Sequence, residues 1–148
     1  MIAIGCDHAG FELKKQLMEY LDSIGVEYTD KGFYVFDKND NYPDVAKQVG
    51  KAVSEGEADK GILICGTGIG MSLCANKYKG VRAVVASDVF SVRYSRMHNN
   101  ANVICFGARV MGIGLVKELL NVFLNEPFEG GRHADRIAEF DKVWEEQK

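Results

Sequence analysis

The sequence lacks a basic excess and a long apolar segment, and each absence argues against a class of protein. Its 148 residues hold 18 basic and 21 acidic side chains, for a net charge of −3. A nucleic-acid-binding domain usually carries a basic patch. No apolar run approaches the roughly 20 residues that a membrane-spanning helix needs. We therefore expect neither nucleic acid nor a membrane as a partner.

The four cysteines include no Cys-x-x-Cys pair and have no histidine cluster beside them, which argues against a zinc site. The N-terminus has neither the charged start nor the apolar stretch of a signal peptide. We therefore expect a cytoplasmic protein with reduced cysteines, without a metal or a cofactor. Free cysteines are usually small buried hydrophobic residues. We expect that role for Cys6, Cys74 and Cys105.

Short apolar segments alternate with amphipathic ones along the chain, without repeats or linkers. Strands are predicted over 2–6, 26–29, 61–65, 82–86 and 103–106. Helices are predicted over 13–24, 43–56, 70–77, 88–98, 113–123 and from 132 onward. This alternation predicts one domain over 1–148, a Rossmann-like three-layer α/β/α sandwich with a five-stranded parallel sheet and an extra C-terminal helix.

Two of the predicted helices have unusual apolar patterns. The segment 113–123 is apolar on nearly all sides, which favours burial between the sheet and a further element such as a partner subunit. The last helix places Ile137, Phe140 and Trp144 on one stripe.

Ligands of such sheets bind outside the carboxyl ends of the strands. Polar residues that follow the strands should therefore meet in one crevice. They are Asp7 and His8, the loop 65–70, Ser87 and Asp88, and the segment 107–109. His98 and Asn99 instead close the helix before the fifth strand, so their approach to the crevice is less evident.

The loop from Cys65 to Gly70 is the most informative of these features. Its three alternating glycines allow backbone N–H groups to point into one concavity, which can bind a phosphate, a carboxylate or a developing oxyanion. A dinucleotide site is the obvious alternative. That fingerprint would require glycine at position 71, where Met71 stands. The register of the loop therefore argues against NAD.

Cys65 ends a predicted strand beside these N–H donors, where a thiolate would be favoured over a thiol. From its position alone, a reactive thiolate and a core cysteine are equally good interpretations. Thr67 is similarly open between capping the loop and contacting a substrate. His8 and His98, near the glycine loop, favour acid–base chemistry modestly over a structural role.

Arg132 and Arg136 lie one turn apart at a helix start, where positive charge is unfavourable unless an anion lies nearby. The alternative is a solvated face. Arginine's planar fork suits a phosphate. Together with the glycine loop, these residues favour a phosphorylated small molecule and proton transfer without a metal.

At this point the sequence resembles ribose-5-phosphate isomerase of type B, a family that includes galactose-6-phosphate isomerase subunits and isomerases of allose phosphate. The matching segments are 5–11, 42–44, 61–71, 98–99, 101–103, 107–109 and 127–133. They follow the family order over nearly the whole chain, and the Cys-Gly-Thr-Gly-Ile-Gly-Met run at 65–71 is specific to it.

The resemblance implies metal-independent aldose–ketose conversion of ribose 5-phosphate and ribulose 5-phosphate, a step of the pentose phosphate pathway, through an enediolate. Cys65 would be the base. His98, helped by Thr67, would open the sugar ring. The remaining implied contacts are Gly66, Gly68, Ile69 and Gly70 for the enediolate oxygens, Asn99 for the intermediate, Asp7 for sugar hydroxyls or His98, Tyr42 for the pocket wall, and His8, Arg109, Arg132 and Arg136 for the phosphate.

The resemblance also implies a homodimer with active sites shared between subunits, and in some members a tetramer. Two alternatives stay open: a galactose-6-phosphate isomerase subunit, and a non-catalytic nucleotide-binding Rossmann-like module. Allose, psicose or their 6-phosphates are further candidate substrates. The segment 33–41 looks longer and more aromatic than is usual in the family, which is expected to affect which sugars fit near Tyr42.

Overall fold

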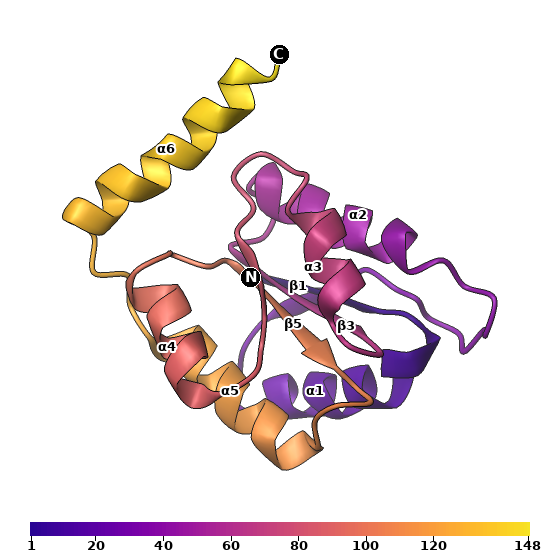
Figure 1. Ribbon diagram of the computed structural model, residues 1–148. Coiled ribbons are helices and arrows are strands. Elements are labelled where there is room, and N and C mark those ends of the chain that lie inside the picture. The colour runs from indigo at the N-terminus through magenta and orange to yellow at the C-terminus, as the bar shows by residue number, and fades with distance from the viewer.

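A computed structural model describes all 148 residues and confirms the α/β architecture. Five parallel strands form one sheet in the order β2-β1-β3-β5-β4 (Figure 1). The strands are β1 (Ile2–Cys6), β2 (Tyr28–Asp30), β3 (Lys60–Cys65), β4 (Ala83–Val85) and β5 (Val103–Gly107). The helices are η1 (His8–Gly10), a 3-10 turn, and α1 (Phe11–Ser23), α2 (Tyr42–Ser54), α3 (Ile69–Ala75), α4 (Val89–Met97), α5 (Ile113–Asn125) and α6 (Arg132–Glu146).

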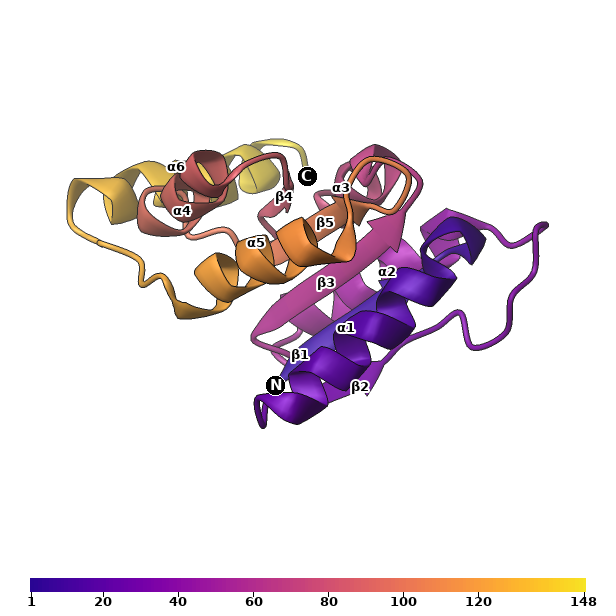
Figure 2. The same cartoon turned by 90° about the horizontal axis from the view of Figure 1, so that it is seen from below.

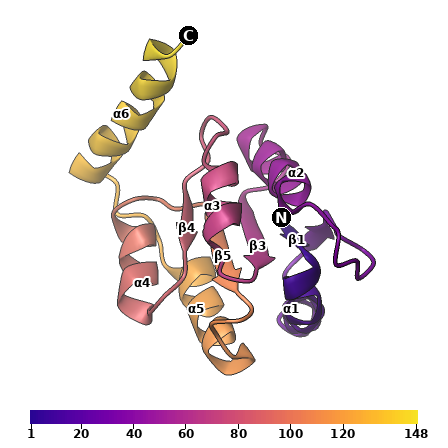
Figure 3. The same ribbon diagram turned by 45° about the vertical axis from the view of Figure 1, so that its right-hand side comes forward.

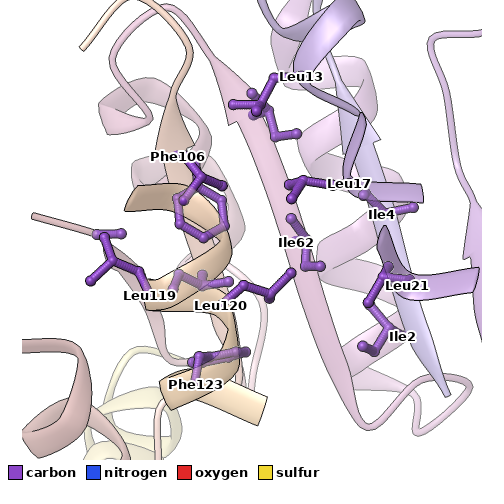
Figure 4. Packing of buried hydrophobic residues seen from close by; sticks show 14 of the residues in the cluster. Ile2, Ile4, Leu13, Leu17, Leu21, Ile62, Phe106, Leu119, Leu120 and Phe123 are labelled. Atoms are coloured by element: carbon purple, nitrogen blue, oxygen red, sulfur yellow. The ribbon is translucent and has the colours of Figure 1, made fainter. Parts of the chain in front are cut away.

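The sheet is covered on both faces because alternate residues of its strands point to opposite sides. In β3, Ile62 and Ile64 pack with α1, α4 and α5, whereas Leu63 and Cys65 pack with α2 and α3. Figure 4 shows the first of these two clusters, in which Phe106 lies between the strands and α5. The three-layer prediction is thereby confirmed.

The two helices with unusual apolar patterns behave differently from each other. Helix α5 buries one face against the sheet through Val116, Leu119, Leu120 and Phe123, while Leu115 is 40% exposed. Burial of its other face by a partner subunit stays a prediction. Helix α6 projects from the body of the molecule (Figure 3), and His133 is its single buried residue.

The apolar stripe of α6 does exist, and it lines a groove of about 550 Å³. Phe140, Val143 and Trp144 stand on one wall, and Val81 and Val84 stand on the other. None of the helices is long and apolar enough to cross a bilayer.

Strand register determines which residues share an edge of the sheet. Cys65 of β3 pairs with Gly107 of β5, and Cys6 of β1 pairs with Ile64. The segments that follow these strands therefore leave the sheet at the same carboxyl edge. At the other end of the same pair, Gly61 is opposite Val103, so the segment that contains His98 enters from the amino edge.

A buried lysine anchors the loop between β2 and α2. Lys14 of α1 is 1% exposed, and its Nζ donates to both carboxylate oxygens of Asp30 at 2.9 and 3.0 Å and to the Phe33 carbonyl at 2.7 Å. A buried ammonium must be paired in this way to avoid a large desolvation penalty. These bonds fix where the loop 31–41 leaves the sheet, beside η1 (Figure 2).

Candidate active site

The loop from Cys65 to Gly70 is held at the carboxyl edge by hydrogen bonds to the exit of β5. The amide of Ala108 donates to the Cys65 carbonyl at 2.8 Å, and the amide of Arg109 donates to the Gly66 carbonyl at 3.1 Å. Inside the loop, the Gly68 amide donates to Cys65 Sγ at 3.1 Å. The sulfur of Cys65 thus has a backbone N–H aimed at it, a contact that stabilises a thiolate.

Four backbone amides of this loop and of the first turn of α3 have no acceptor within the protein: those of Gly66, Thr67, Gly70 and Met71. The Ile69 amide is engaged, because it donates to Thr67 Oγ1 at 3.2 Å. Capping of the loop is therefore observed for Thr67. Gly68 and Ile69 were predicted to offer free amides and do not, whereas Met71 does. The free N–H groups form the anion-binding concavity expected of the glycine pattern.

Gly68 and Gly70 are required by the space around them. Gly68 has φ of +81°, and a Cβ there would lie 3.2 Å from the Cys105 carbonyl oxygen. A Cβ on Gly70 would lie 2.5 Å from Cε1 of the Tyr42 ring. Tyr42 thus closes one side of the loop, as predicted for a pocket wall.

On the other side of the loop, the Arg109 guanidinium lies beside Gly66, with Nη1 3.3 Å from the position of a Gly66 Cβ. Arg109 also lines a cavity of about 640 Å³ together with His8, Phe36 and Lys38. Three cationic or potentially cationic side chains and one carboxylate, that of Glu12, line this space. The basic side chains outnumber the carboxylate, so the cavity is suited to an anion.

Asp7 and His8 follow β1 directly and face this edge. Asp7 Oδ1 accepts hydrogen bonds from the amides of Ala9 and Gly10 at 2.9 and 3.2 Å, so Asp7 caps η1. Burial raises the pKa of the Asp7 carboxyl. His8 Nδ1 lies 2.9 Å from Asp40 Oδ1, so the ring is held by a residue that the sequence did not single out.

A second group of side chains stands at the amino edge. The rings of His98 and His133 stack with centroids 4.1 Å apart and an angle of 11° between their planes. Glu129 Oε2 is 3.7 Å from His98 Nε2 and 3.4 Å from His133 Nε2. Burial, then the charges of His98 and Arg132, lower the pKa of His133.

Sequence reasoning missed His133 and Glu129 as members of this group. His133 was the one histidine left unassigned, although it adjoins Arg132, and this neighbourhood was the available signal. Asn99 follows His98 directly, and Arg132 and Arg136 lie in the first turns of α6. All three residues are exposed.

The two groups lie at opposite edges of the sheet. Four steps of about 3.3 Å separate Gly61 from Cys65 along β3, or about 13 Å. Figure 1 accordingly shows the end of α4 and the start of α6 across the molecule from the loop between β3 and α3. Within one chain, His98 therefore reaches neither Thr67 nor Asp7, and Arg132 and Arg136 do not reach the glycine loop. These residues do not meet within a single chain, and the shared site that the resemblance implies stays a prediction.

The other three cysteines contrast with Cys65. Burial raises the pKa of Cys6 to about 12 and also raises the pKa of Cys105. Cys74 is half-buried, with its Sγ 3.9 Å from the Pro43 carbonyl. All four are free thiols. Cys6 and Cys105 are inert core residues, as expected.

Two trios of side chains have the spacing of cation ligands: His98 with Glu129 and His133, and Asp7 with His8 and Asp40. In each trio the ligand atoms lie within 4.8 Å of one another. In the second trio, His8 Nδ1 and Asp7 Oδ1 already make hydrogen bonds within the protein. These contacts explain the trio without a metal ion.

Comparison with known proteins gives one consistent match. The family model described as Ribose/Galactose Isomerase matches residues 2–140. The chain is 50% identical over 136 residues to Ribose-5-phosphate isomerase B of Escherichia coli, covering 92% of this chain and 91% of that protein. It is 41% identical over 147 residues to D-erythrulose-4-phosphate isomerase of Pectobacterium atrosepticum, covering 99% and 97%. It is 40% identical over 149 residues to Galactose-6-phosphate isomerase subunit LacB of Clostridium acetobutylicum, covering 100% and 86%.

Solved structures agree with these relatives. Ribose-5-Phosphate Isomerase B of Clostridium thermocellum superposes with a TM-score of 0.96 at 39% identity, covering 99% of both chains. Ribose-5-phosphate isomerase B of Mycoplasma genitalium, solved with bound ribulose-5-phosphate, superposes with a TM-score of 0.94 at 40% identity, covering 98% of this chain and 96% of that one.

Proposed function

The chain belongs to the ribose/galactose isomerase family and is an isomerase, and we propose that it interconverts ribose 5-phosphate and ribulose 5-phosphate. The observation that carries this proposal is Cys65, whose sulfur accepts the Gly68 amide and which begins a segment with four free amides. The 50% identity to the Escherichia coli enzyme and the ribulose-5-phosphate in the Mycoplasma genitalium structure support the choice of substrate.

The proposed reaction moves one proton between neighbouring carbons. The Cys65 thiolate takes the proton from C2 of the open-chain aldose, so that the C2–H bond breaks and an S–H bond forms. The electron pair moves into the C1–C2 bond and charge develops on the carbonyl oxygen. The thiol then returns its proton to C1, and the hydroxyl proton passes from O2 to O1. No oxidant or reductant is consumed.

In this proposal the enediolate oxygens are stabilised by hydrogen bonds from the free backbone amides of Gly66, Thr67, Gly70 and Met71. A positioned base contributes about 10²–10⁴-fold to the rate. Removal of one oxyanion donor lowers kcat by about 10²–10³-fold. The loop is therefore at least as important as the thiol, which explains why no Lewis acid is needed in this proposal.

We also propose that a second copy of the chain completes each site. His98, Asn99, Arg132 and Arg136 stand at the amino edge, too far from Cys65 to share a pentose phosphate within one chain. In a two-fold dimer the same contact occurs twice, so the amino edge of each copy would face the carboxyl edge of the other. The partner's edge then supplies His98 for ring opening and the arginines for the phosphate. Further pairing into a tetramer is compatible with this arrangement.

A cytoplasmic location is part of the proposal and is supported by four free cysteines in a chain without disulfides. Membership of the isomerase family disfavours the nucleotide-binding module considered from the sequence.

The substrate is tested by incubating the protein in deuterated water with each candidate sugar and following by NMR the C2 proton of an aldose or the C1 protons of a ketose. We expect exchange and ketose formation to be fastest with ribose 5-phosphate. D-erythrulose 4-phosphate, galactose 6-phosphate, allose 6-phosphate and unphosphorylated allose and psicose complete the series, because relatives of similar identity carry the first two names. Absence of exchange with ribose 5-phosphate, with turnover of another member, would replace the proposed substrate.

A further inference from the structure

The loop 31–41 carries one buried side chain, Asp40, to which the reaction above assigns no role. Asp40 Oδ1 lies 2.9 Å from His8 Nδ1, across 32 residues of sequence. The Asp40 side chain is only 5% exposed, although it belongs to a surface loop. Its second oxygen, Oδ2, is buried without a hydrogen-bond partner. A buried carboxylate is stabilised by its hydrogen bonds, and the contact with His8 is the one side-chain hydrogen bond that Asp40 has.

The same contact constrains His8. Because Nδ1 is occupied by Asp40, Nε2 is the ring nitrogen left for a ligand. Phe36 packs its ring edge-on to His8 with centroids 6.1 Å apart, and Phe11 packs against Phe36 at 6.2 Å. The imidazole is thus held on two sides by residues of one loop.

The rest of the loop supports this placement. Its start is tied to α1 through the bond from Lys14 to the Phe33 carbonyl, and its end leads into Tyr42 beside Gly70. Between these points Lys38 reaches the cavity of about 640 Å³ that His8 and Arg109 line. The loop therefore contributes a cation of its own to this cavity and orients the imidazole of His8, which also lines it.

We propose that Asp40 is a positioning residue for phosphate recognition. It fixes the His8 ring at Nδ1 so that Nε2 meets the phosphate group of the substrate in the cavity that Arg109 and Lys38 also line. This inference rests on the proposed function, because it takes the ligand to be a sugar phosphate. It gives the loop 31–41 a defined part in substrate affinity.

The test is a double-mutant cycle between Asp40 and His8. Asp40→Ala removes the carboxylate, Asp40→Asn keeps its shape and an acceptor, and His8→Ala removes the ring. We expect Asp40→Ala to raise the KM for ribose 5-phosphate about tenfold, since a hydrogen bond of a charged group is lost. The kcat should stay within about twofold, and Asp40→Asn should recover part of the loss.

In the His8→Ala background, Asp40→Ala should raise KM no further, because the group through which it acts is absent. Asp37→Asn is the matched control: Asp37 lies in the same loop, and its side chain accepts only the nearby Asn39 amide at 2.9 Å. The Asp37 carbonyl accepts the Asp40 amide at 3.1 Å, a backbone bond that the substitution keeps. Asp37→Asn should leave KM unchanged. Two results would overturn the inference: an Asp40 effect that persists without His8, or one that lowers kcat as much as it raises KM.

A binding measurement separates this inference from the choice of substrate. Calorimetric titration with inorganic phosphate needs no turnover, and the Kd should rise for Asp40→Ala and not for Asp37→Asn. Equal Kd values for wild type and Asp40→Ala would refute the role of Asp40 whatever the sugar is. Weaker phosphate binding by Asp40→Ala, in a protein that does not convert ribose 5-phosphate, would sustain the inference and reject the substrate. If Asp40→Ala does not fold, Asp40→Asn carries the same measurements.

Discussion

The two edges of the sheet hold the two groups of candidate residues, and these groups are built in different ways. At the carboxyl edge the reactive atoms belong largely to the backbone: four free amides and a sulfur that accepts the Gly68 amide at 3.1 Å. At the amino edge they belong to side chains, with two stacked imidazoles, one carboxylate and the exposed Arg132 and Arg136.

This difference corresponds to the two kinds of charge on the proposed substrate. Charge that appears only during the reaction is best met by fixed dipoles, which need no reorganisation. The phosphate charge is present throughout, so longer side chains that adjust on binding can meet it. We therefore expect changes in the loop from Cys65 to Gly70 to reduce kcat, and changes of the arginines at the amino edge to raise KM.

The largest effect is expected from Cys65→Ala, which removes the proposed base. The kcat for ribose 5-phosphate should fall about 10²–10⁴-fold, because a positioned base contributes that factor. Binding of the substrate should persist. Steady-state kinetics together with calorimetric binding measure both quantities. Cys74→Ala is the matched control and should keep full activity; an active Cys65→Ala variant would remove the thiolate from the mechanism.

A slightly smaller loss is expected from Gly70→Ala, which changes the shape of the loop and leaves its sulfur in place. The new Cβ would lie 2.5 Å from the Tyr42 ring, so the ring or the loop must move. Displacement of one oxyanion donor predicts a loss in kcat of about 10²–10³-fold.

Gly114→Ala provides the matched control, since a Cβ there meets nothing within 4 Å and Gly114 is also helical. Kinetic assay and thermal unfolding of both variants would show whether the loss is specific to the loop. Wild-type kcat in Gly70→Ala would mean that the position of these amides is not critical.

A moderate recovery of activity is expected when two inactive variants are mixed. This experiment tests whether each site combines the carboxyl edge of one chain with the amino edge of another. Cys65→Ala damages the carboxyl edge and His98→Asn the amino edge. In a mixed dimer with shared sites, one site receives both defects and the other receives none. With random exchange, half the dimers are mixed and half their sites are intact, so about a quarter of wild-type activity should return.

The mixture is assayed after unfolding and refolding together, and each variant refolded alone is the control. No recovery in a mixture shown to contain mixed dimers would place both edges of one site on one chain.

The smallest effect is expected from His133→Asn, and it concerns stability against pH. Burial lowers the pKa of His133 in the folded protein. Below about pH 6.5, the ordinary value for histidine, the unfolded chain therefore takes up the proton first. Folding is then progressively disfavoured as the pH falls toward the lowered pKa, and no such penalty exists above pH 6.5.

Wild type should accordingly lose more thermal stability than His133→Asn between pH 7 and pH 5. Melting temperatures of both proteins at the two pH values test this. If the melting temperature of wild type falls less than that of His133→Asn between pH 7 and pH 5, the pKa of His133 is not lowered in the folded protein.

Much of the fold could be predicted because its signals are local. Alternating apolar segments specified the parallel sheet, and Pro43 and Asp88 marked helix starts that the structure contains. The strand boundaries were less accurate: β2 begins at Tyr28 and not at Val26, because the pairing with β1 begins there, a non-local contact.

The candidate site could be predicted as a set of residues but not as an arrangement. Cys65 and its glycines adjoin one another, so their geometry follows from one strand and one loop. Cys65 ends β3, whereas His98 is the C-cap of α4 and precedes β5, the neighbour of β3. Only the register of these two strands shows that the two residues stand at opposite ends of the sheet. Asp40 could not be found, because its role depends on a contact with His8 across 32 residues.

The pairing of Gly61 with Val103 and of Cys65 with Gly107 has a genetic consequence for a dimer of the proposed kind. Every chain would serve in both sites, one through each end of its sheet. An allele that changes Cys65 alone would spare one site in each heterodimer and behave as recessive. An allele that changes both Cys65 and His98 would disable both sites of every dimer that it enters, and would be dominant over the normal copy.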